Sequence, residues 1–253
     1  PATVNTELYN GSSWTETANL NTARNLLMGA GSQTSFVAAA GYAGSGSPAS
    51  ETWDGSSWTE ITEMNTVRWA GGSAGADTES FIAFGGNPNT TVTETWNGSA
   101  WTEVSDMNLA RHALAGSGSQ TAAIGFGGNV SGPPYKSETE VWNGSSWTEV
   151  SDLNTGRTDV GGAGSSTAAL AFGGTITPPR TAKTESWDGS SWTEVADLAT
   201  DKASGAGQRG TSASNTSTLY AGGKIPSYTT QTEEWSFPSG PHLNEGDIFL
   251  SGG

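Results

Sequence analysis

The sequence contains no cysteine, only ten lysines and arginines, and no long run of apolar residues. The lack of cysteine excludes disulfides, thiol catalysis and cysteine-ligated zinc. With a formal net charge of −15, the chain has no broad basic surface for phosphates, so we predict no nucleic-acid partner. No stretch approaches the roughly 18 consecutive apolar residues of a membrane span, so we also predict no membrane insertion.

Glycine and tryptophan are the residues that stand out in this composition. Only 33% of the residues are hydrophobic and 36 are glycine, which by itself resembles a disordered chain. The 11 tryptophans point the other way, because disordered segments bury few large aromatic side chains. We therefore predict a packed protein, long enough for one large domain or two small ones. Because residue 1 is proline rather than methionine, we expect a segment of a longer chain or assembly.

An internal repeat organises nearly the whole chain. The motif Trp-Asp/Asn-Gly-Ser-Ser/Ala-Trp occurs at residues 53–58, 96–101, 142–147 and 187–192. An earlier copy begins with Tyr9 instead of tryptophan, and a degenerate last copy begins at Trp235. The first aromatic residues of successive copies are 44, 43, 46, 45 and 48 residues apart. A period of this length is typical of propeller blades and other repeat architectures.

Each repeat contains four short segments with the properties of β-strands. Residues 51–53 are β-branched and aromatic, and Asp54 with Gly55 begins a tight turn into a strand at residues 57–61. A connector that ends in arginine leads to a strand of small residues, such as 113–118, which a narrow central axis requires. An apolar run that ends in Gly-Gly follows, at residues 81–86, 121–128, 168–174 and 219–223. Since no helical period of comparable length occurs, we predict an all-β fold.

These features predict a β-propeller of four-stranded antiparallel blades. The Gly-Gly pair after the second strand, the Glu-x-aromatic-Asp/Asn third strand and the tryptophan of the fourth strand resemble the kelch repeat. The resemblance covers residues 3–236 and includes the arginine that ends each connector. The Trp-Asp pairs at residues 53–54 and 187–188 suggest WD40 repeats instead, but asparagine replaces the aspartate elsewhere and no Gly-His precedes.

The repeat count predicts a closed ring of five blades, with six as the alternative. The five units lie near residues 19–61, 62–104, 105–150, 151–195 and 196–236, within a domain that spans residues 1–240. The last unit lacks a fourth strand, so we expect residues 1–18 to supply it and to close the ring, which hides the sheet edges. Residues 6–9 and 232–235 compete for the third strand of this closing blade. Residues 241–253 are expected to be a tail or linker, although residues 246–253 resemble another second strand.

The repeated aromatic and basic side chains are expected to be structural. The paired tryptophans should pack at the outer edge of each blade, and stacking on sugars is the alternative. The arginines should pair with repeated glutamates and anchor the connectors, and an anion-binding ring is the alternative. This structural group consists of Trp14, Trp53, Trp58, Trp96, Trp101, Trp142, Trp147, Trp187, Trp192, Trp235, Arg24, Arg111 and Arg157.

Residues that depart from the repeat are the candidate binding residues. After each Gly-Gly the chain passes through a connection of variable content, at residues 42–50, 87–92, 129–137, 175–183 and 224–229. By strand order these connections share one edge with the arginine-ending connectors, and variable loops on a rigid scaffold are typical of recognition surfaces. We predict binding through Trp69, which interrupts the repeat, and through Arg68, Tyr42, Tyr135 and His112.

The sequence favours binding over catalysis. Neither histidine, His112 or His242, belongs to a constellation with a nucleophile and an acid, so we predict no enzyme, no metal site and no cofactor. The alternative is an enzyme or cation-binding module at the mouth of the central axis, where Asp106, Asp152 and Asp197 would gather.

A second resemblance suggests where the protein acts. Near-identical phrases such as Ser-Ser-Trp-Thr-Glu-Val, and the end of the chain at residues 243–253, resemble kelch-like arrays in structural, tail-associated proteins of marine bacteriophages. The resemblance implies a virion-associated adhesion or scaffold module, exposed on a virion or outside a cell. We accordingly expect a monomeric propeller whose partner is a glycan or another protein.

Overall fold

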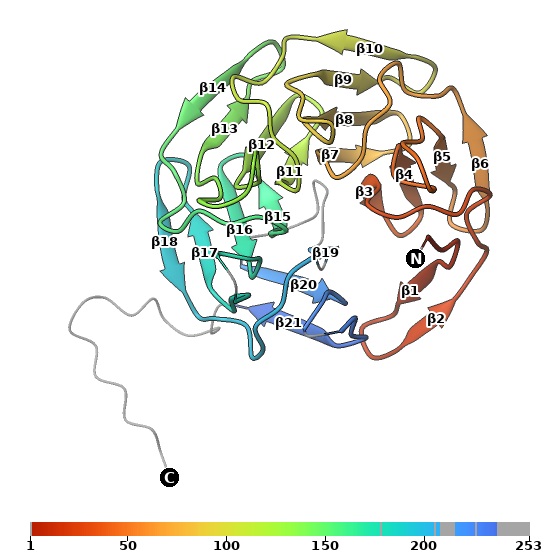
Figure 1. Ribbon diagram of the computed structural model, residues 1–253. Coiled ribbons are helices and arrows are strands. Elements are labelled where there is room, and N and C mark those ends of the chain that lie inside the picture. Colours follow the sequence, from red (N-terminus) through yellow and green to blue (C-terminus); the bar gives the residue numbers. More distant parts are fainter. Residues whose placement is uncertain (1, 178, 205, 208–215, 226, 237–253) are drawn as a thin grey trace.

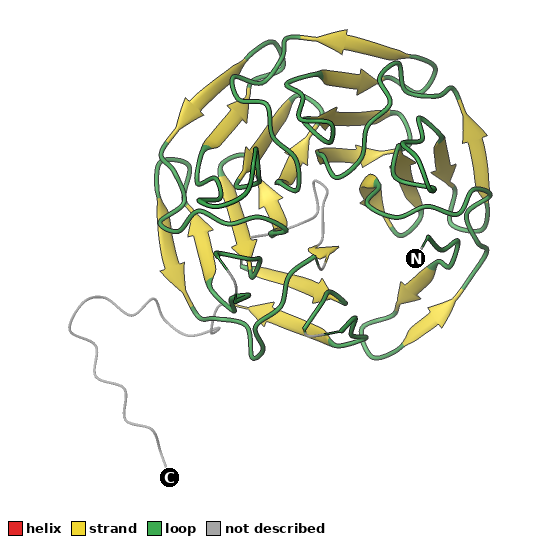
Figure 2. Ribbon diagram, viewed as in Figure 1, coloured by secondary structure: helices red, strands yellow, loops and turns green. Residues whose placement is uncertain are grey.

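The computed structural model describes residues 2–177, 179–204, 206–207, 216–225 and 227–236, and every regular element in these ranges is a β-strand (Figure 1 and Figure 2). Four sheets have four strands, one has three and one has two. Neighbouring strands in these sheets are antiparallel. This confirms the predicted all-β fold of repeated four-stranded sheets. None of the described residues forms a helix that is long and apolar enough to cross a membrane.

Each four-stranded sheet consists of consecutive strands from one repeat. The first contains β3 (Met28–Ser32), β4 (Ser35–Ala39), β5 (Ser50–Trp53) and β6 (Trp58–Ile61). The second contains β7 (Gly72–Asp77), β8 (Ser80–Phe84), β9 (Thr93–Trp96) and β10 (Trp101–Val104). The third contains β11 (Ala115–Ser119), β12 (Ala122–Phe126), β13 (Thr139–Trp142) and β14 (Trp147–Val150). The fourth contains β15 (Gly161–Ser165), β16 (Ala168–Phe172), β17 (Thr184–Trp187) and β18 (Trp192–Val195).

The four complete sheets stand around a common axis like the blades of a propeller (Figure 1). The first strand of each sheet, rich in glycine and alanine, lies nearest to the axis, and the fourth strand lies at the rim. Small side chains on the inner strands allow neighbouring sheets to approach closely. The strands with the smallest side chains thus lie nearest to the axis, where the space between sheets is narrowest.

The two ends of the described chain form the remaining sheets, and here the structure differs from the expected arrangement. One sheet has three strands, β19 (Ala206–Gly207), β20 (Ser217–Ala221) and β21 (Thr232–Ser236). β1 (Glu7–Tyr9) pairs with β2 (Trp14–Glu16), so among the described residues β2 does not join the last sheet as its fourth strand. The reason is that β21 occupies the third position, while β1 and β2 form their own hairpin in the register of β5 and β6. The tail at residues 241–253 lies outside the described residues.

The aspartate or asparagine of each repeat holds the hairpin turn. In the first sheet, Asp54 Oδ1 accepts hydrogen bonds from the backbone N–H groups of Ser57 and Ser56, both at 2.8 Å. These bonds lower the pKa of Asp54 to about 2. Gly55 supplies the positive φ of 97° that the turn needs. Asparagine makes the same backbone contacts in three other copies, which explains why the two residue types alternate: Asn10, Asn97 and Asn143.

The paired tryptophans pack beside this turn. In the four complete sheets the ring centroids of each pair are 5.4 to 5.6 Å apart. The second tryptophan of a pair also reaches the preceding sheet: Trp147 Nε1 donates to Thr93 Oγ1 and Trp192 Nε1 to Thr139 Oγ1, both at 3.0 Å. The pairs therefore stabilise their own hairpin and join neighbouring sheets. Trp14, in the two-stranded sheet, is 38% exposed.

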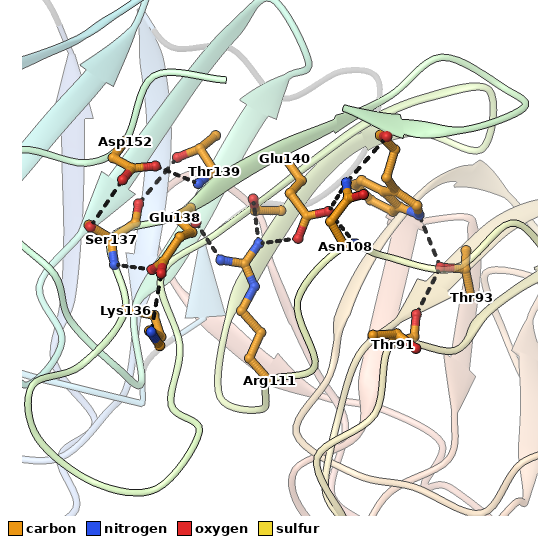
Figure 3. A network of polar contacts seen from close by, with 12 residues as sticks. Thr91, Thr93, Asn108, Arg111, Lys136, Ser137, Glu138, Thr139, Glu140 and Asp152 are labelled. Carbon is orange, nitrogen blue, oxygen red and sulfur yellow. Dashed lines mark hydrogen bonds and ion pairs between the residues drawn. The ribbon is translucent and has the colours of Figure 1, made fainter. Parts of the chain in front are cut away.

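An ion pair anchors each of the five connectors to the sheet that it enters, and Figure 3 shows the buried pair of Arg111 and Glu140. The guanidinium of Arg111 lies 3.2 Å from the carboxylate of Glu140 in β13, and both side chains are at most 1% exposed. Glu140 also accepts hydrogen bonds from the backbone and side-chain amides of Asn108, at 2.7 and 2.9 Å. Burial lowers the pKa of Arg111, and the charge of Glu140 opposes that shift. The equivalent pairs are Arg24–Glu51 at 2.5 Å, Arg68–Glu94 at 3.5 Å, Arg157–Glu185 at 2.9 Å and Lys202–Glu233 at 2.6 Å.

Replacing Glu94 by alanine should lower the free energy of unfolding by about 3–5 kcal/mol, because buried Arg68 would lose its counter-charge. Glu103→Ala is the matched control. Glu103 lies directly opposite Glu94 on β10 but is exposed, so its loss should cost less than about 0.5 kcal/mol. Urea denaturation followed by tryptophan fluorescence measures both values. Equal losses in the two variants would contradict the role of the buried pair.

Asp54→Asn should leave the melting temperature at pH 7 nearly unchanged, because asparagine holds the same turn in other repeats, whereas Asp54→Ala should lower it by a few degrees. The lowered pKa adds a pH dependence. The contribution of the charged carboxylate is complete above the ordinary pKa of 3.8 and is lost as the pH falls towards about 2. The wild type should therefore lose stability relative to Asp54→Asn between pH 4 and pH 2. Thermal melts across this range measure the difference, and parallel curves would argue against it.

Candidate functional site

The variable connections and the arginine-ending connectors meet along one edge of the sheets. In each repeat, two residues form an isolated antiparallel bridge. One directly follows the arginine or lysine of the connector, and the other directly follows the Gly-Gly pair. In the first repeat, Ala40–Gly41 takes the place of Gly-Gly. We call the surface formed by these bridges and the variable connections the bridge edge. The bridges join Asn25 to Tyr42, Trp69 to Asn87, His112 to Asn129, Thr158 to Thr175 and Ala203 to Lys224. Three of the five predicted binding residues are thus bridge residues.

Tyr42 and Trp69 belong to neighbouring repeats and form an aromatic pair on the bridge edge. Their ring centroids are 5.3 Å apart and the ring planes are tilted by 58°. Both side chains are partly exposed. A Cβ atom added to Gly46 would lie 2.9 Å from the Trp69 ring, so the backbone of the first variable connection lies against that ring. The pair presents apolar ring surface together with a hydroxyl and an indole N–H, the combination that suits a partly wet binding surface.

His112 makes the second contact between neighbouring repeats on this edge. Its Nδ1 atom lies 2.6 Å from Oδ1 of Asn89, in the variable connection of the preceding repeat. Burial lowers the pKa of His112 below its ordinary value of 6.5, and the charge of Asp159 in the following repeat opposes the shift. Burial likewise raises the pKa of Asp159. The imidazole is therefore neutral at pH 7 and holds Asn89 by a hydrogen bond without adding charge to the surface.

The other two predicted binding residues lie in different surroundings. Arg68 is fully buried: its guanidinium donates to the carbonyls of Val92 and Ala83 and pairs with Glu94. Burial lowers the pKa of Arg68 to about 10. The structure thus places Arg68 with the structural arginines and not on the bridge edge. Tyr135 is partly exposed, in a connection whose Pro133 and Pro134 are exposed.

The three aspartates that were expected at the axis mouth hold the starts of third strands. Asp106 accepts hydrogen bonds from Thr91 Oγ1 at 2.9 Å and from the backbone N–H of Thr93 at 3.3 Å. Asp152 and Asp197 accept from the equivalent backbone N–H groups of Thr139 and Thr184, at 3.3 and 3.1 Å. Across the described ranges, no group of three or more His, Cys, Asp or Glu residues is placed to hold a metal ion.

A cavity of about 870 Å³ extends from the central axis to the β1–β2 hairpin, and sequence reasoning missed it. Its walls include the axis-facing ends of the connectors and the flanks of the first and last sheets, among them Leu8, Leu26, Phe36, Trp58, Asp159 and Trp235. One signal in the sequence could have revealed it. Six copies of the third-strand motif stand beside only five copies of the inner strand pair, so one sheet position is short of inner strands.

In comparisons with known proteins, no family model matches this sequence and no curated protein is significantly similar to it.

The imidazole of His112 should titrate below pH 6.5, and Asp159→Asn should lower its midpoint further by removing a carboxylate that favours the charged ring. Since the pKa is lowered in the folded state, the stabilisation by the neutral ring is present above pH 6.5 and is lost as the pH falls through the folded value. NMR titration of the imidazole protons, assigned with a His112→Gln variant, measures both midpoints. A wild-type midpoint at or above the ordinary value would argue against burial of the ring.

Proposed function

We propose that this chain is a non-catalytic β-propeller that binds a glycan through the bridge edge. The proposal is supported by one observation: the repeated side chains and the unrepeated side chains occupy different places in the structure. The repeated arginines, glutamates and tryptophans make contacts inside and between the sheets. Tyr42, Trp69 and the His112–Asn89 pair occur once each and lie partly or fully exposed on a single edge. Aromatic rings beside amide and imidazole groups match the mixed apolar and hydroxyl surface of a sugar.

Ring closure is part of this proposal. The indole of Trp14 donates to Thr232 Oγ1 at 3.0 Å, and the indole of Trp58 donates to Thr6 Oγ1 at 3.1 Å. The same bond joins the second sheet to the third and the third to the fourth. These contacts support a closed ring with six sheet positions, the alternative to five blades, in which β1 and β2 form the outer half of the sixth blade. In such a ring the bridge edge is one rigid surface.

The kelch-like repeat suggests the setting of this activity. We infer an adhesion or scaffold module of a virion or another extracellular structure, built on a monomeric ring, as the resemblance to phage tail-associated arrays implies. A protein partner is the second candidate, because Tyr228 on the last variable connection is 72% exposed.

A glycan-array screen of the full chain tests the proposal. Trp69→Ala should weaken binding to the bound glycan about ten-fold, or about 1.4 kcal/mol. Replacing residues 130–134 with a Gly-Ser turn should also weaken or alter binding, with little effect on stability, because shortening a surface loop changes its closure entropy only slightly. Trp101→Ala is the control. Trp101 is 7% exposed and belongs to a repeated pair, so this variant should melt at a lower temperature and bind the same glycan.

Two outcomes would contradict the proposal. If folded Trp101→Ala loses binding while the Trp69 and loop variants bind unchanged, the recognition surface lies on the repeated part of the blades. If no glycan on the array binds, but the chain binds a protein and Trp69→Ala abolishes that binding, then the bridge edge is the binding surface and the proposed glycan is the wrong class of ligand.

A further inference from the structure

In the part of the chain that the structure describes, the sheet formed by β1 and β2 has no counterpart of the two strands that lie nearest to the axis in the complete sheets. In the other sheets, the third-strand glutamate pairs with the basic residue of the incoming connector. Glu7 is the equivalent glutamate in β1, yet it is exposed and its side chain makes no ion pair or hydrogen bond with any described residue. Its neighbour Leu8 is only partly buried and lines the cavity with it.

Among the described residues, no strand pairs with the inner edge of β1. The carbonyl of Thr6 accepts from the N–H of Thr17 at 2.9 Å, and the N–H of Asn10 donates to Ser13 at 3.2 Å, so these residues bond toward β2. Because successive residues of a strand direct their backbone groups to opposite sides, the N–H groups of Glu7 and Tyr9 face the cavity. An exposed row of this kind is a template for an added strand.

Two series of backbone hydrogen bonds between sheets end at the same gap. The first series involves the second residue after the basic residue of each connector. Its backbone N–H donates to the carbonyl of the equivalent residue in the preceding sheet, at 2.7 to 2.9 Å: Ala70 to Leu26, Ala113 to Ala70, Asp159 to Ala113 and Ser204 to Asp159. In the second, the last glycine of each second strand donates to the carbonyl of the next connector's basic residue: Gly41 to Arg68, Gly86 to Arg111, Gly128 to Arg157 and Gly174 to Lys202. Among the described residues, no glycine donates in this way to the carbonyl of Arg24.

The second series sets requirements for a strand that fills the gap. Such a strand must end in two residues of positive φ, the second of them glycine: the φ values are 61° and 123° at Gly85 and Gly86, and 55° and 125° at Ala40 and Gly41. It must also carry an apolar residue four positions before the last glycine, where Ile82, Ile124 and Leu170 are each 0% exposed. Residues 246–253, Gly-Asp-Ile-Phe-Leu-Ser-Gly-Gly, meet both requirements, with Phe249 at the apolar position.

We propose that residues 246–253 of this chain add to the inner edge of β1 as the second strand of the sixth sheet. The register follows from the other sheets, in which Ile82 lies opposite Thr95 and Phe81 opposite Trp96. It places Phe249 opposite Leu8 and Ile248 opposite Tyr9, and it directs the N–H of Gly253 to the carbonyl of Arg24. The proposal rests on the closed ring proposed above.

The path of the chain fits this assignment. Strand β21 ends at Ser236, at the end of its sheet where the hairpin turns lie, as third strands do in every repeat. An antiparallel partner of β1 must start at that same end of the strands. Nine residues, 237–245, separate the two strands, and extended they span up to about 30 Å. Ser236 and Tyr9 line the same cavity, and the Tyr9 hydroxyl donates to Glu234 at 3.0 Å.

Engineered cysteine pairs in the full chain test the register, because the natural sequence contains no cysteine. Leu8 bonds toward β2, so Leu8 and Phe249 form a non-hydrogen-bonded pair with Cα atoms about 4.5 Å apart, within disulfide range. Leu8→Cys/Phe249→Cys should oxidise at least ten-fold faster than the control pair Leu8→Cys/Leu250→Cys, whose second cysteine lies on the opposite face of the added strand. Non-reducing gels and intact mass measure the rates and the size of the product.

The expected result is a monomeric disulfide for the first pair only. Equal rates for both pairs, or no disulfide in either, would overturn the proposal, and a disulfide found only in dimers would assign the gap to a second copy. Exchange of the Trp14 indole N–H, followed by NMR in the wild type, separates this failure from failure of the ring. A protected indole without the disulfide refutes the added strand alone, whereas a freely exchanging indole refutes ring closure.

Discussion

The basic residue at the end of a connector is the residue on which the rest of the structure depends, because from the second connector to the fifth it makes two kinds of contact at once. Its side chain forms a buried ion pair with the third strand of the sheet that it enters, as Arg111 does with Glu140. Its main-chain carbonyl accepts a hydrogen bond from the glycine that ends the second strand of the preceding sheet, 2.9 Å away in the case of Gly86. One residue therefore fixes both the position of its own sheet and the spacing to its neighbour.

The same constraint explains why a folded protein can have a composition that resembles a disordered one. The inner strands approach so closely that a Cβ atom on Gly116 would lie 2.6 Å from the ring of Phe84 in the preceding sheet. Large residues are therefore confined to a few positions, and glycine and alanine fill the rest. Apolar burial is concentrated in aromatic rings such as Phe84 and Trp147, whose centroids are 4.6 Å apart. A small number of hydrophobic residues suffices because each buried tryptophan and phenylalanine ring contributes a large apolar surface to the core.

The recurring parts of the fold could be predicted from the sequence, and the parts that occur once could not. Residues 51–53 and 57–61 were expected as strands, and β5 and β6 occupy Ser50–Trp53 and Trp58–Ile61. The place of the β1–β2 hairpin could not be deduced, because its sequence matches third and fourth strands generally and does not name the sheet that it joins. The left-handed φ of 54° at Ala70 carries no signal in residue type either.

Sequence reasoning was also limited at the bridge edge, where neighbouring residues have opposite surroundings. Arg68 and Trp69 were both candidates for binding, yet Arg68 is buried in its ion pair and Trp69 is partly exposed beside Tyr42. No periodic pattern separates two adjacent residues of an irregular connector. The contact between His112 and Asn89 joins two repeats across 23 positions, which a single sequence does not reveal.

This arrangement explains how one edge can vary while the fold stays constant. Trp69 is flanked by Arg68, whose side chain is held by Glu94, and by Ala70, whose N–H donates to the carbonyl of Leu26 at 2.8 Å. Trp69 itself is held by backbone hydrogen bonds to Asn87, at 2.7 and 3.2 Å. None of these contacts uses the Trp69 side chain, so the backbone position is fixed whichever residue stands there. Asparagine, histidine, threonine and alanine occupy the equivalent positions in the other repeats. Side chains on the bridge edge can therefore vary without loss of these backbone contacts, whereas a change one residue earlier removes the buried ion pair between Arg68 and Glu94.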